Sequence, residues 1–437
     1  MSIDFTVSTL GPATIPSPIQ LSRIDGDWVA NYVRDDEWVV YDLEVIGEAG
    51  AESVGGRGLM EKSGPREQLF FDPSKVHAAI LTCGGLCPGL NNVVRAAVMT
   101  LWHQYGVRRI SGIRFGYRGM LPGGEEPLAL EPAVVRDVQH QGGTLLGSSR
   151  GGGERTAEMV DWLVARGINI VLPIGGDGTQ RGALKLSKEI GRRGLPIAVV
   201  GIPKTIDNDL SFIEQSFGFE SAVSMAVGAV SGAHTEARDA INGVGLVKVM
   251  GREAGFIAVH TALASNDVNF VLIPEVPFDL EGDVGFLAQL ERRVLARGHA
   301  VVLVAEGAGQ SLVSASGQDA SGNRSLGDIG LFLKDRISAH FKGKGLELNL
   351  KYIDPSYIIR SAAANPADAI YCARLGAAAV HAAMSGRTGC LVGKVNGRIV
   401  HIPTSVAVGN RNVVDPESAL WRDVVENTGQ PALMRRS

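Results

Sequence analysis

The segment PKTIDND, at residues 203–209, holds side chains whose types and spacing suit proton abstraction. Thr205, Asp207 and Asp209 alternate along the chain, and alternate residues of an extended segment face the same side. A hydroxyl group that acts as a nucleophile needs a carboxylate within hydrogen-bonding reach to accept its proton. The segment therefore predicts a general base, and a turn rich in Asp and Asn is the structural alternative.

Two glycine pairs, at residues 84–85 and 175–176, each lie between an apolar run and a helical pattern. Glycine lets backbone amides and the positive end of a helix approach a phosphate closely. Tight turns that bind nothing are the alternative, because glycine-rich turns are common. Asp177 follows the second pair, where a carboxylate can hold Mg²⁺ on nucleotide phosphates or cap the helix. The surrounding glycines, including Gly178, favour the phosphate interpretation.

Further charged residues could hold the substrates. Arg150 stands beside flexible glycines, a setting that suits a polyphosphate. Arg252, Lys351 and Arg360 are candidate clamps for a phosphate on the acceptor. Glu306 is a candidate partner for sugar hydroxyls. Each of these residues taken alone is more commonly a solvated charge.

The elements that must position these residues form an α/β pattern. Strands are expected at 77–82, 168–174, 197–202, 245–249 and 299–305. A helix is predicted over 92–104, with Val94, Ala97, Val98 and Leu101 on one face. Apolar strands that alternate with helices indicate a mainly parallel sheet covered on both sides. The candidate residues follow the strands, and ligands bind beyond the carboxyl ends of strands in such sheets.

Length and composition limit the class of protein. The chain has 437 residues, so two domains are expected. The net charge of −4 argues against a general nucleic-acid binder. No apolar run is long enough for a transmembrane helix, and no signal peptide is visible, so we expect a cytoplasmic protein with no membrane partner. Cys83 and Cys87 lack the spacing of common zinc sites, so metal binding by them is not expected, and the four cysteines are expected to be reduced thiols of a cytoplasmic protein.

Residues 1–75 differ from the rest of the chain. They hold prolines, an acidic cluster at 35–37 and the glycine-rich run at 47–58. We expect an N-terminal extension with little regular structure and one strand near 38–43.

The motifs together resemble the phosphofructokinase family. GGLCPGLN, GSSRGGG, GGDGT, PKTIDND, MGREAGF, AEG and YIIR occur in the family's order, over roughly residues 76–410. PKTIDND followed by MGR is highly specific, whereas GGDGT is not. ASNDVNFVLIPEVPF and NLKYIDPSYIIR are especially similar to the ATP-dependent enzymes of plants and trypanosomes.

The resemblance implies phosphoryl transfer from ATP–Mg²⁺ to the 1-hydroxyl of fructose 6-phosphate. It implies Asp207 as the proton acceptor, with Thr205, Asp209 and Lys204 in support. Donor binding is implied for Gly85, Arg150, Gly151, Gly175, Gly176, Asp177, Gly178 and Thr179, with Asp177 also binding Mg²⁺. Sugar-phosphate binding is implied for Thr205, Ile206, Asp207, Met250, Gly251, Arg252, Glu306, Lys351, Tyr357 and Arg360. Gly243 falls where short bacterial enzymes have another phosphate-binding arginine, so that contact is expected to be missing.

The family's architecture implies two Rossmann-like lobes with the active site between them. A donor-binding lobe is expected at 76–217 plus 359–409, and a sugar-phosphate-binding lobe at 218–358 plus 410–437. The family also implies a homo-oligomer, either a dimer or a tetramer.

Three other functions are compatible with parts of the sequence. Pyrophosphate is the alternative donor: its users typically have Asp at the position of Gly178, although they share Lys204. GGDG also resembles NAD kinases and lipid kinases, which lack PKTIDND and MGR. A non-catalytic regulatory paralogue is the alternative of another class.

Overall fold

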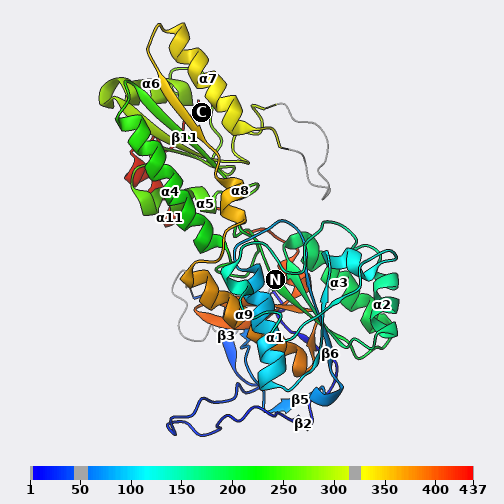
Figure 1. Cartoon of the computed structure of the whole chain (residues 1–437). Helices are drawn as coiled ribbons and strands as arrows, with labels where there is room; N and C mark the ends of the chain where they lie inside the picture. The colour runs from blue at the N-terminus through cyan, green and yellow to red at the C-terminus, as the bar shows by residue number, and fades with distance from the viewer. Residues whose placement is uncertain (1–2, 44–57, 314–325, 437) are drawn as a thin grey trace. The chain divides into compact units, whose positions relative to one another are not determined.

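The computed structural model describes residues 3–43, 58–313 and 326–436. The chain forms two compact units, each built from three separate segments (Figure 1). Unit 1 comprises Met1–Thr205, Leu210–Gly218 and Ala362–Arg411. Unit 2 comprises Ile206–Asp209, Phe219–Ser361 and Asn412–Ser437. The PKTIDND segment therefore contains a passage from unit 1 to unit 2.

Unit 1 is built on a seven-stranded sheet in the order β17-β16-β10-β9-β6-β7-β8. Its strands are β6 (His77–Thr82), β7 (Arg109–Ile113), β8 (Leu128–Ala129), β9 (Ile170–Gly175), β10 (Ala198–Pro203), β16 (Cys390–Val395) and β17 (Arg398–Pro403). The five central strands pair in parallel, and the edge strands β8 and β17 pair antiparallel with their neighbours. The prediction of a mainly parallel sheet is confirmed for this unit.

Helices cover both faces of this sheet. Helices α1 (Leu90–Met99) and α9 (Pro366–Met384) pack against each other on one side, and a π-helix (Thr100–Gln104) continues α1. Helices α2 (Thr156–Ala165) and α3 (Asp177–Arg192) share a buried core with alternate residues of the central strands. The helix predicted over 92–104 is confirmed, and all four residues of its predicted apolar face are buried.

Unit 2 contains a parallel four-stranded sheet in the order β12-β13-β11-β14. These strands are β11 (Gly243–Val249), β12 (Phe270–Leu272), β13 (His299–Ala305) and β14 (Asn349–Ile353). Helices α4 (Phe219–Arg238), α5 (Phe256–Ser265) and α11 (Ala419–Thr428) share one apolar core with the sheet. Helices α6 (Phe286–Arg297) and α7 (Ile329–Gly343) share a second core with it. Two shorter helices are α8 (Ser356–Arg360) in this unit and α10 (Thr404–Ala407) in unit 1. No helix in the described part of the chain is both long and apolar enough to cross a membrane.

The N-terminal extension packs with unit 1 through short strands. β1 (Ser8–Thr9) pairs with β15 (Arg387–Thr388), and β2 (Ile15–Pro16) pairs with β5 (Gln68–Leu69). β3 (Trp38–Val40), the strand expected near 38–43, pairs with β4 (Leu59–Glu61). All of the glycine-rich run except its last residue lies outside the described residues.

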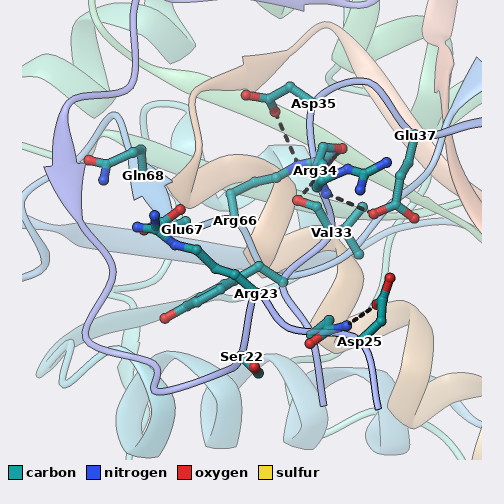
Figure 2. A pocket seen from close by; sticks show the side chains of 12 residues that line it. Ser22, Arg23, Asp25, Val33, Arg34, Asp35, Glu37, Arg66, Glu67 and Gln68 are labelled. Atoms are coloured by element: carbon teal, nitrogen blue, oxygen red, sulfur yellow. Dashed lines mark hydrogen bonds and ion pairs between the residues drawn. The ribbon is translucent and has the colours of Figure 1, made fainter. Parts of the chain in front are cut away.

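A polar cavity of about 320 Å³ lies within this extension (Figure 2). It is lined by Ser22, Arg23, Asp25, Asn31, Tyr32, Val33, Arg34, Asp35, Glu37, Arg66, Glu67 and Gln68. Its charged side chains largely pair with one another, Arg23 with Glu67 and Arg66 with Asp35 at 3.5 Å. None of the site residues predicted from the sequence lines this cavity.

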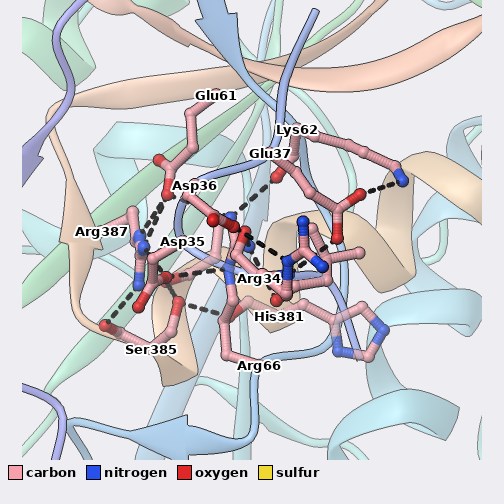
Figure 3. Close-up of polar contacts among 12 residues, drawn as sticks. Arg34, Asp35, Asp36, Glu37, Glu61, Lys62, Arg66, His381, Ser385 and Arg387 are labelled. Atoms are coloured by element: carbon pink, nitrogen blue, oxygen red, sulfur yellow. Dashed lines mark hydrogen bonds and ion pairs between the residues drawn. The ribbon is translucent and has the colours of Figure 1, made fainter. Parts of the chain in front are cut away.

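A buried network of charges fastens the extension to the rest of unit 1 (Figure 3). Glu61 accepts hydrogen bonds from Arg66 at 3.0 Å and from Arg387 of β15 at 2.5 Å. His401 of β17, which is fully buried, lies 2.9 Å from the same carboxylate. Burial alone would raise the pKa of Glu61, but the bonds from His401 and Arg387 outweigh it and lower the pKa to about 2. Glu61 is therefore an ionised, buried anchor between the extension and the sheet.

Candidate active site

A tight glycine turn connects β9 to the start of α3. β9 ends at Gly175, and α3 begins at Asp177. The Gln180 side chain donates to the carbonyl oxygens of Gly175 at 2.9 Å and Ile202 at 3.2 Å, which ties together the ends of β9 and β10. Thr179 leaves no room for a side chain at Gly175. The turn therefore holds the amino terminus of α3, whose first amides lack partners within the helix, at the sheet edge.

Two further loops of unit 1 lie against each other. The amide of Gly84 donates to the carbonyl oxygen of Ser149 at 3.0 Å, and the Ser148 hydroxyl donates to the carbonyl oxygen of Gly84 at 2.7 Å. Gly84 has φ +86° and Gly151 has φ +80°, conformations that favour glycine. The structure thus brings the loop of Gly85 beside the loop of Arg150 and Gly151.

Lys204 connects these loops to the α3 turn. Its amide donates to the carbonyl oxygen of Gly175 at 3.0 Å. A Cβ atom placed on Gly84 would lie 3.7 Å from the Lys204 ammonium. The Gly84 loop and the end of β9 therefore both lie next to Lys204, whose charge can oppose that of a phosphate.

Asp177 is the candidate ligand for Mg²⁺. Its carboxylate pairs with Arg181 at 2.8 Å and is partly exposed. No group of three or more metal-binding side chains occurs among the residues that the structure describes. A single protein carboxylate fits Mg²⁺, because that ion commonly takes one or two carboxylates and completes its shell with phosphate oxygens and water.

The PKTIDND segment is not extended as the alternation assumed. Residues Ile206 and Asp207 form a turn, and Asn208 has φ +58°. The prediction that alternate residues face one side is therefore wrong, and the turn weighed as the alternative is the observed backbone. Thr205, whose carbonyl oxygen accepts a bond from Ser216, belongs to unit 1, and Asp207 belongs to unit 2.

Neighbouring segments of unit 2 support the Asp207 turn. The amide of Arg252 lies 3.4 Å from the Asp207 carboxylate. The amide of Asn412 donates to the carbonyl oxygen of Asp209 at 3.0 Å. Ile206 packs against the apolar core that α4 and α5 share with the sheet, and Met250 is a member of that core. The structure thus brings the candidate base together with the MGR segment.

The MGR segment follows β11 and lies against the segment that follows β13. The Gly307 amide donates to the Gly251 carbonyl oxygen at 3.0 Å, and the Glu306 amide donates to the Val249 carbonyl oxygen at 2.9 Å. Gly251 has φ +128°, and a side chain there would meet the Ala254 carbonyl oxygen. The glycine is therefore required for this close approach.

Glu306 lies in a partly buried group of charges. Burial raises the pKa of Glu306, while the charges of Arg252, Lys248 and Arg360 oppose that rise. The Arg360 guanidinium stacks on the Tyr357 ring, 4.2 Å from its centroid. This cluster offers cations for a phosphate and a carboxylate for hydroxyl groups.

Two positions considered in the sequence, Lys351 and Gly243, are not among the described residues found to interact in this cluster. Lys351 of β14 is half exposed, and its ammonium lies 4.0 Å from Glu236 of α4, which was outside the predicted set. Gly243, the first residue of β11, has no room for a side chain because the Ala237 carbonyl of α4 occupies that space. An arginine at position 243 is therefore excluded by the packing of α4.

The sequence interpretation missed Lys248, Asp354 and Gln310, which support the same cluster. Lys248 pairs with Asp354 at 2.9 Å. The Gln310 amide donates to the carbonyl oxygen of Glu306 at 2.8 Å. A signal was available for Lys248 alone, because it is a charged residue inside the otherwise apolar strand GVGLVKV.

Comparison with known families identifies the kind of protein that carries the predicted donor and sugar-phosphate residues. The model of the family described as phosphofructokinase matches residues 77–383. The chain belongs to the phosphofructokinase family. It is 51% identical over 445 residues to the ATP-dependent 6-phosphofructokinase of Borreliella burgdorferi, and the match covers 99% of this chain and 98% of the relative.

The expected similarity to plant and trypanosome phosphofructokinases is confirmed. The chain is 46% identical to the ATP-dependent 6-phosphofructokinase 7 of Arabidopsis thaliana, over 96% of this chain and 86% of the relative. It is 45% identical to the ATP-dependent enzyme of Trypanosoma brucei brucei, over 85% of this chain and 76% of the relative. A crystal structure of a pyrophosphate-dependent phosphofructokinase from Marinobacter aquaeolei shares the fold, with a TM-score of 0.66 at 22% identity over 81% of this chain and 91% of that one.

Proposed function

We propose that this chain transfers a phosphoryl group from ATP to the 1-hydroxyl of fructose 6-phosphate, which gives fructose 1,6-bisphosphate. The activity is that of an ATP-dependent 6-phosphofructokinase, an enzyme of glycolysis. The observation that carries this conclusion is the 51% identity to a relative of that name over nearly the whole of both chains.

The donor side of the reaction is assigned to unit 1. We assign the ATP phosphates to Gly85, Arg150, Gly151 and the turn 175–179. Asp177 would hold Mg²⁺, which neutralises charge on the phosphates when it is bound. Lys204 would stabilise the charge of the transferring phosphoryl group. The hydrogen bonds that join these loops support the assignment.

The acceptor side is assigned to unit 2 and the adjoining Thr205. Asp207 accepts the proton of the 1-hydroxyl, with Thr205 and Asp209 in support. The remaining sugar-phosphate contacts are assigned to Ile206, Met250, Gly251, Arg252, Glu306, Lys351, Tyr357 and Arg360. Transfer is in line and direct, so that positioning and charge stabilisation supply most of the catalysis.

The setting of the enzyme is a further part of the proposal. We infer a homo-oligomer of two or four chains in the cytoplasm. All four cysteines are free and buried, which is compatible with a reducing compartment.

The donor is tested by comparing ATP–Mg²⁺ with pyrophosphate. A Cβ atom on Gly178 would meet no atom within 4 Å outside its chain neighbours and the backbone of its own helix, so glycine leaves the space beside the α3 turn open. A carboxylate there would compete with a nucleotide phosphate for that space and repel it. We expect Gly178→Asp to lower kcat/KM for ATP, by about tenfold or more if one charged contact is lost. The measurement is kcat/KM with each donor at saturating fructose 6-phosphate.

Gly191→Asp is the matched control, because Gly191 lies in the same helix and also has open space. It should leave kcat/KM for ATP nearly unchanged. Turnover of the unmodified enzyme with pyrophosphate and none with ATP would replace the donor. The absence of turnover with both donors would overturn the proposed function.

A further inference from the structure

Lys248 is a charged residue inside the parallel sheet of unit 2. It is the sixth residue of β11, which pairs with β13 on one side and β14 on the other. Its side chain is only 12% exposed, and the strand around it is buried. A lysine is expensive to bury unless its ammonium is paired, so its partners explain its presence.

The partners are two aspartates, and in each of them one carboxylate oxygen accepts a backbone amide while the other pairs with Lys248. Asp354 accepts from the Ser356 amide with Oδ1 at 3.1 Å, at the start of α8, and pairs with Lys248 through Oδ2 at 2.9 Å. Asp328 accepts from the Leu331 amide with Oδ1 at 3.1 Å, at the start of α7, and pairs with Lys248 through Oδ2 at 3.1 Å. One ammonium therefore holds the amino termini of two helices to β11.

The segments joined in this way carry the proposed sugar-phosphate contacts. β11 runs directly into Met250, Gly251 and Arg252. Helix α8 carries Tyr357 and Arg360, which stack on each other.

Gln310 adds the fourth segment to this arrangement. Its amide donates to the carbonyl oxygen of Glu306 at 2.8 Å and to that of Gly327 at 3.1 Å. The Gly327 amide donates back to the Gln310 side chain at 3.0 Å. The segment of Glu306 is thus tied to the residue that precedes Asp328.

We infer that Lys248 is a positioning residue that fixes α8 and the Glu306 segment for binding of fructose 6-phosphate. The inference rests on the proposed function, because it concerns the residues assigned there to the sugar phosphate. Lys248 acts through Asp354 and Asp328 and is not assigned a contact with the substrate.

Two physical effects follow from loss of the ammonium. The aspartates would face each other without a cation, and α8 would lose its link to β11. Negative charge would also be left uncompensated near Glu306, since Lys248 and Asp354 both act on that carboxylate. A phosphorylated sugar would meet a less favourable potential there.

Lys248→Met and Asp354→Asn test the inference, singly and together. Methionine keeps an unbranched apolar stem, and asparagine keeps an oxygen that can cap α8. Each single change should raise KM for fructose 6-phosphate about tenfold, the effect of one charge-assisted hydrogen bond. KM for ATP should stay within about twofold, and kcat at saturating sugar should change little. The double variant should be no worse than the more impaired single variant, because both changes remove one interaction.

Glu291→Gln is the matched control for Asp354→Asn. Glu291 pairs with His340 of α7 at 2.6 Å in the same unit, and it is 19% exposed against 29% for Asp354. This control should leave KM for fructose 6-phosphate unchanged. Amide hydrogen exchange over 354–361 should be faster in Lys248→Met than in Glu291→Gln, a readout that does not need turnover.

The outcomes separate this inference from the proposed function. If the unmodified enzyme turns over fructose 6-phosphate but the Lys248 and Asp354 variants only lose thermal stability, with KM for the sugar unchanged, Lys248 is not a positioning residue. Equal increases in KM for both substrates, or additive effects in the double variant, would also overturn the inference. An unmodified chain that neither binds nor phosphorylates fructose 6-phosphate would instead overturn the proposed function on which the inference rests.

Discussion

Lys204 and Asp207 are three residues apart in the sequence but belong to different units. Lys204 lies at the end of β10 with its ammonium beside the glycine turn of residues 84–85. Asp207 lies in a turn whose carboxylate is within 3.4 Å of the Arg252 amide. Lys204, proposed to stabilise the phosphoryl group, therefore belongs to unit 1, and Asp207, proposed to accept the hydroxyl proton, belongs to unit 2. Only two residues separate them in the chain.

Replacement of Asp207 by serine tests the proposed base. We expect kcat to fall by about 10²–10⁴-fold, the usual contribution of general acid–base catalysis. KM for fructose 6-phosphate should change little, because proton transfer occurs only in the transition state. Steady-state kinetics at saturating ATP provide the measurement.

Asp423→Ser provides the control for this change. Asp423 is a half-exposed residue of α11 that pairs with Arg422, and such surface pairs contribute little. Its kcat should match that of the unmodified enzyme. An Asp207→Ser variant with similar kcat would remove Asp207 from the role of base.

At the scale of elements, the extension is held to unit 1 by strand pairing and by the charges around Glu61. β1 pairs with β15, and Glu61 of β4 bonds to Arg387 of β15. His401 of β17 also contacts the Glu61 carboxylate, at 2.9 Å. The extension is thus attached to β15 and, through His401, to β17, the edge strand of the seven-stranded sheet.

Glu61→Gln should destabilise unit 1 by about 3–5 kcal/mol, because removal of one partner leaves buried charges unpaired. Glu37→Gln is the matched control in the same extension. Its carboxylate pairs with Lys62 at 2.5 Å in a more exposed setting, and such pairs contribute about 0–1 kcal/mol. The midpoint of urea unfolding measures the stability of each variant. Equal losses of stability in Glu61→Gln and Glu37→Gln would contradict the anchoring role of Glu61.

The same carboxylate predicts a dependence of stability on pH. The pKa of Glu61 falls from 4.5 to about 2 on folding, so its contribution is complete above pH 4.5 and is lost as the pH falls toward 2. Unfolding midpoints of the unmodified enzyme should therefore drop through this range by more than those of Glu61→Gln. Parallel curves for the two proteins would show that Glu61 does not carry the effect.

The strands of the central sheets could be predicted because each is a continuous apolar run. β6 and β13 have the predicted bounds, and β9, β10 and β11 differ from the predictions by at most two residues at either end. The geometry around Asp207 could not be predicted in this way, because alternation implies one face only when the backbone is extended. Asn208, with its positive φ, interrupts that pattern.

The polar networks were beyond prediction for a different reason. Glu61 and Arg387 are separated by 326 residues, and neither stands in a recognisable motif. Lys248 is recognisable in the sequence as a charged residue in an apolar strand. Its partners Asp328 and Asp354 can be identified only from the fold. Local patterns therefore predict where a strand ends, while the pairing of distant charges depends on the sheet order that brings them together.

At the scale of the whole molecule, the donor residues are assigned to unit 1 and most acceptor residues to unit 2. Each ligand should therefore protect a different unit from amide hydrogen exchange, because binding opposes local opening. A non-hydrolysable ATP analogue should slow exchange over 175–192. Fructose 6-phosphate should slow it over 250–256 and 354–361.

Helix α6 supplies an internal control for this experiment. It lies in unit 2 at Phe286–Arg297 and holds none of the assigned residues. Exchange there should respond to neither ligand. Protection of unit 2 alone by the ATP analogue would contradict the assignment of the donor to unit 1.

The division of each unit into three separate chain segments has a consequence for the history and engineering of the enzyme. No single stretch of the gene encodes either unit, so a single recombination event cannot exchange one unit as an intact cassette. A hybrid made by joining two relatives at one crossover point would mix parts of both units. Changes of donor or acceptor preference along this lineage are therefore expected to accumulate as point substitutions, at positions such as Gly178, within a chain inherited whole.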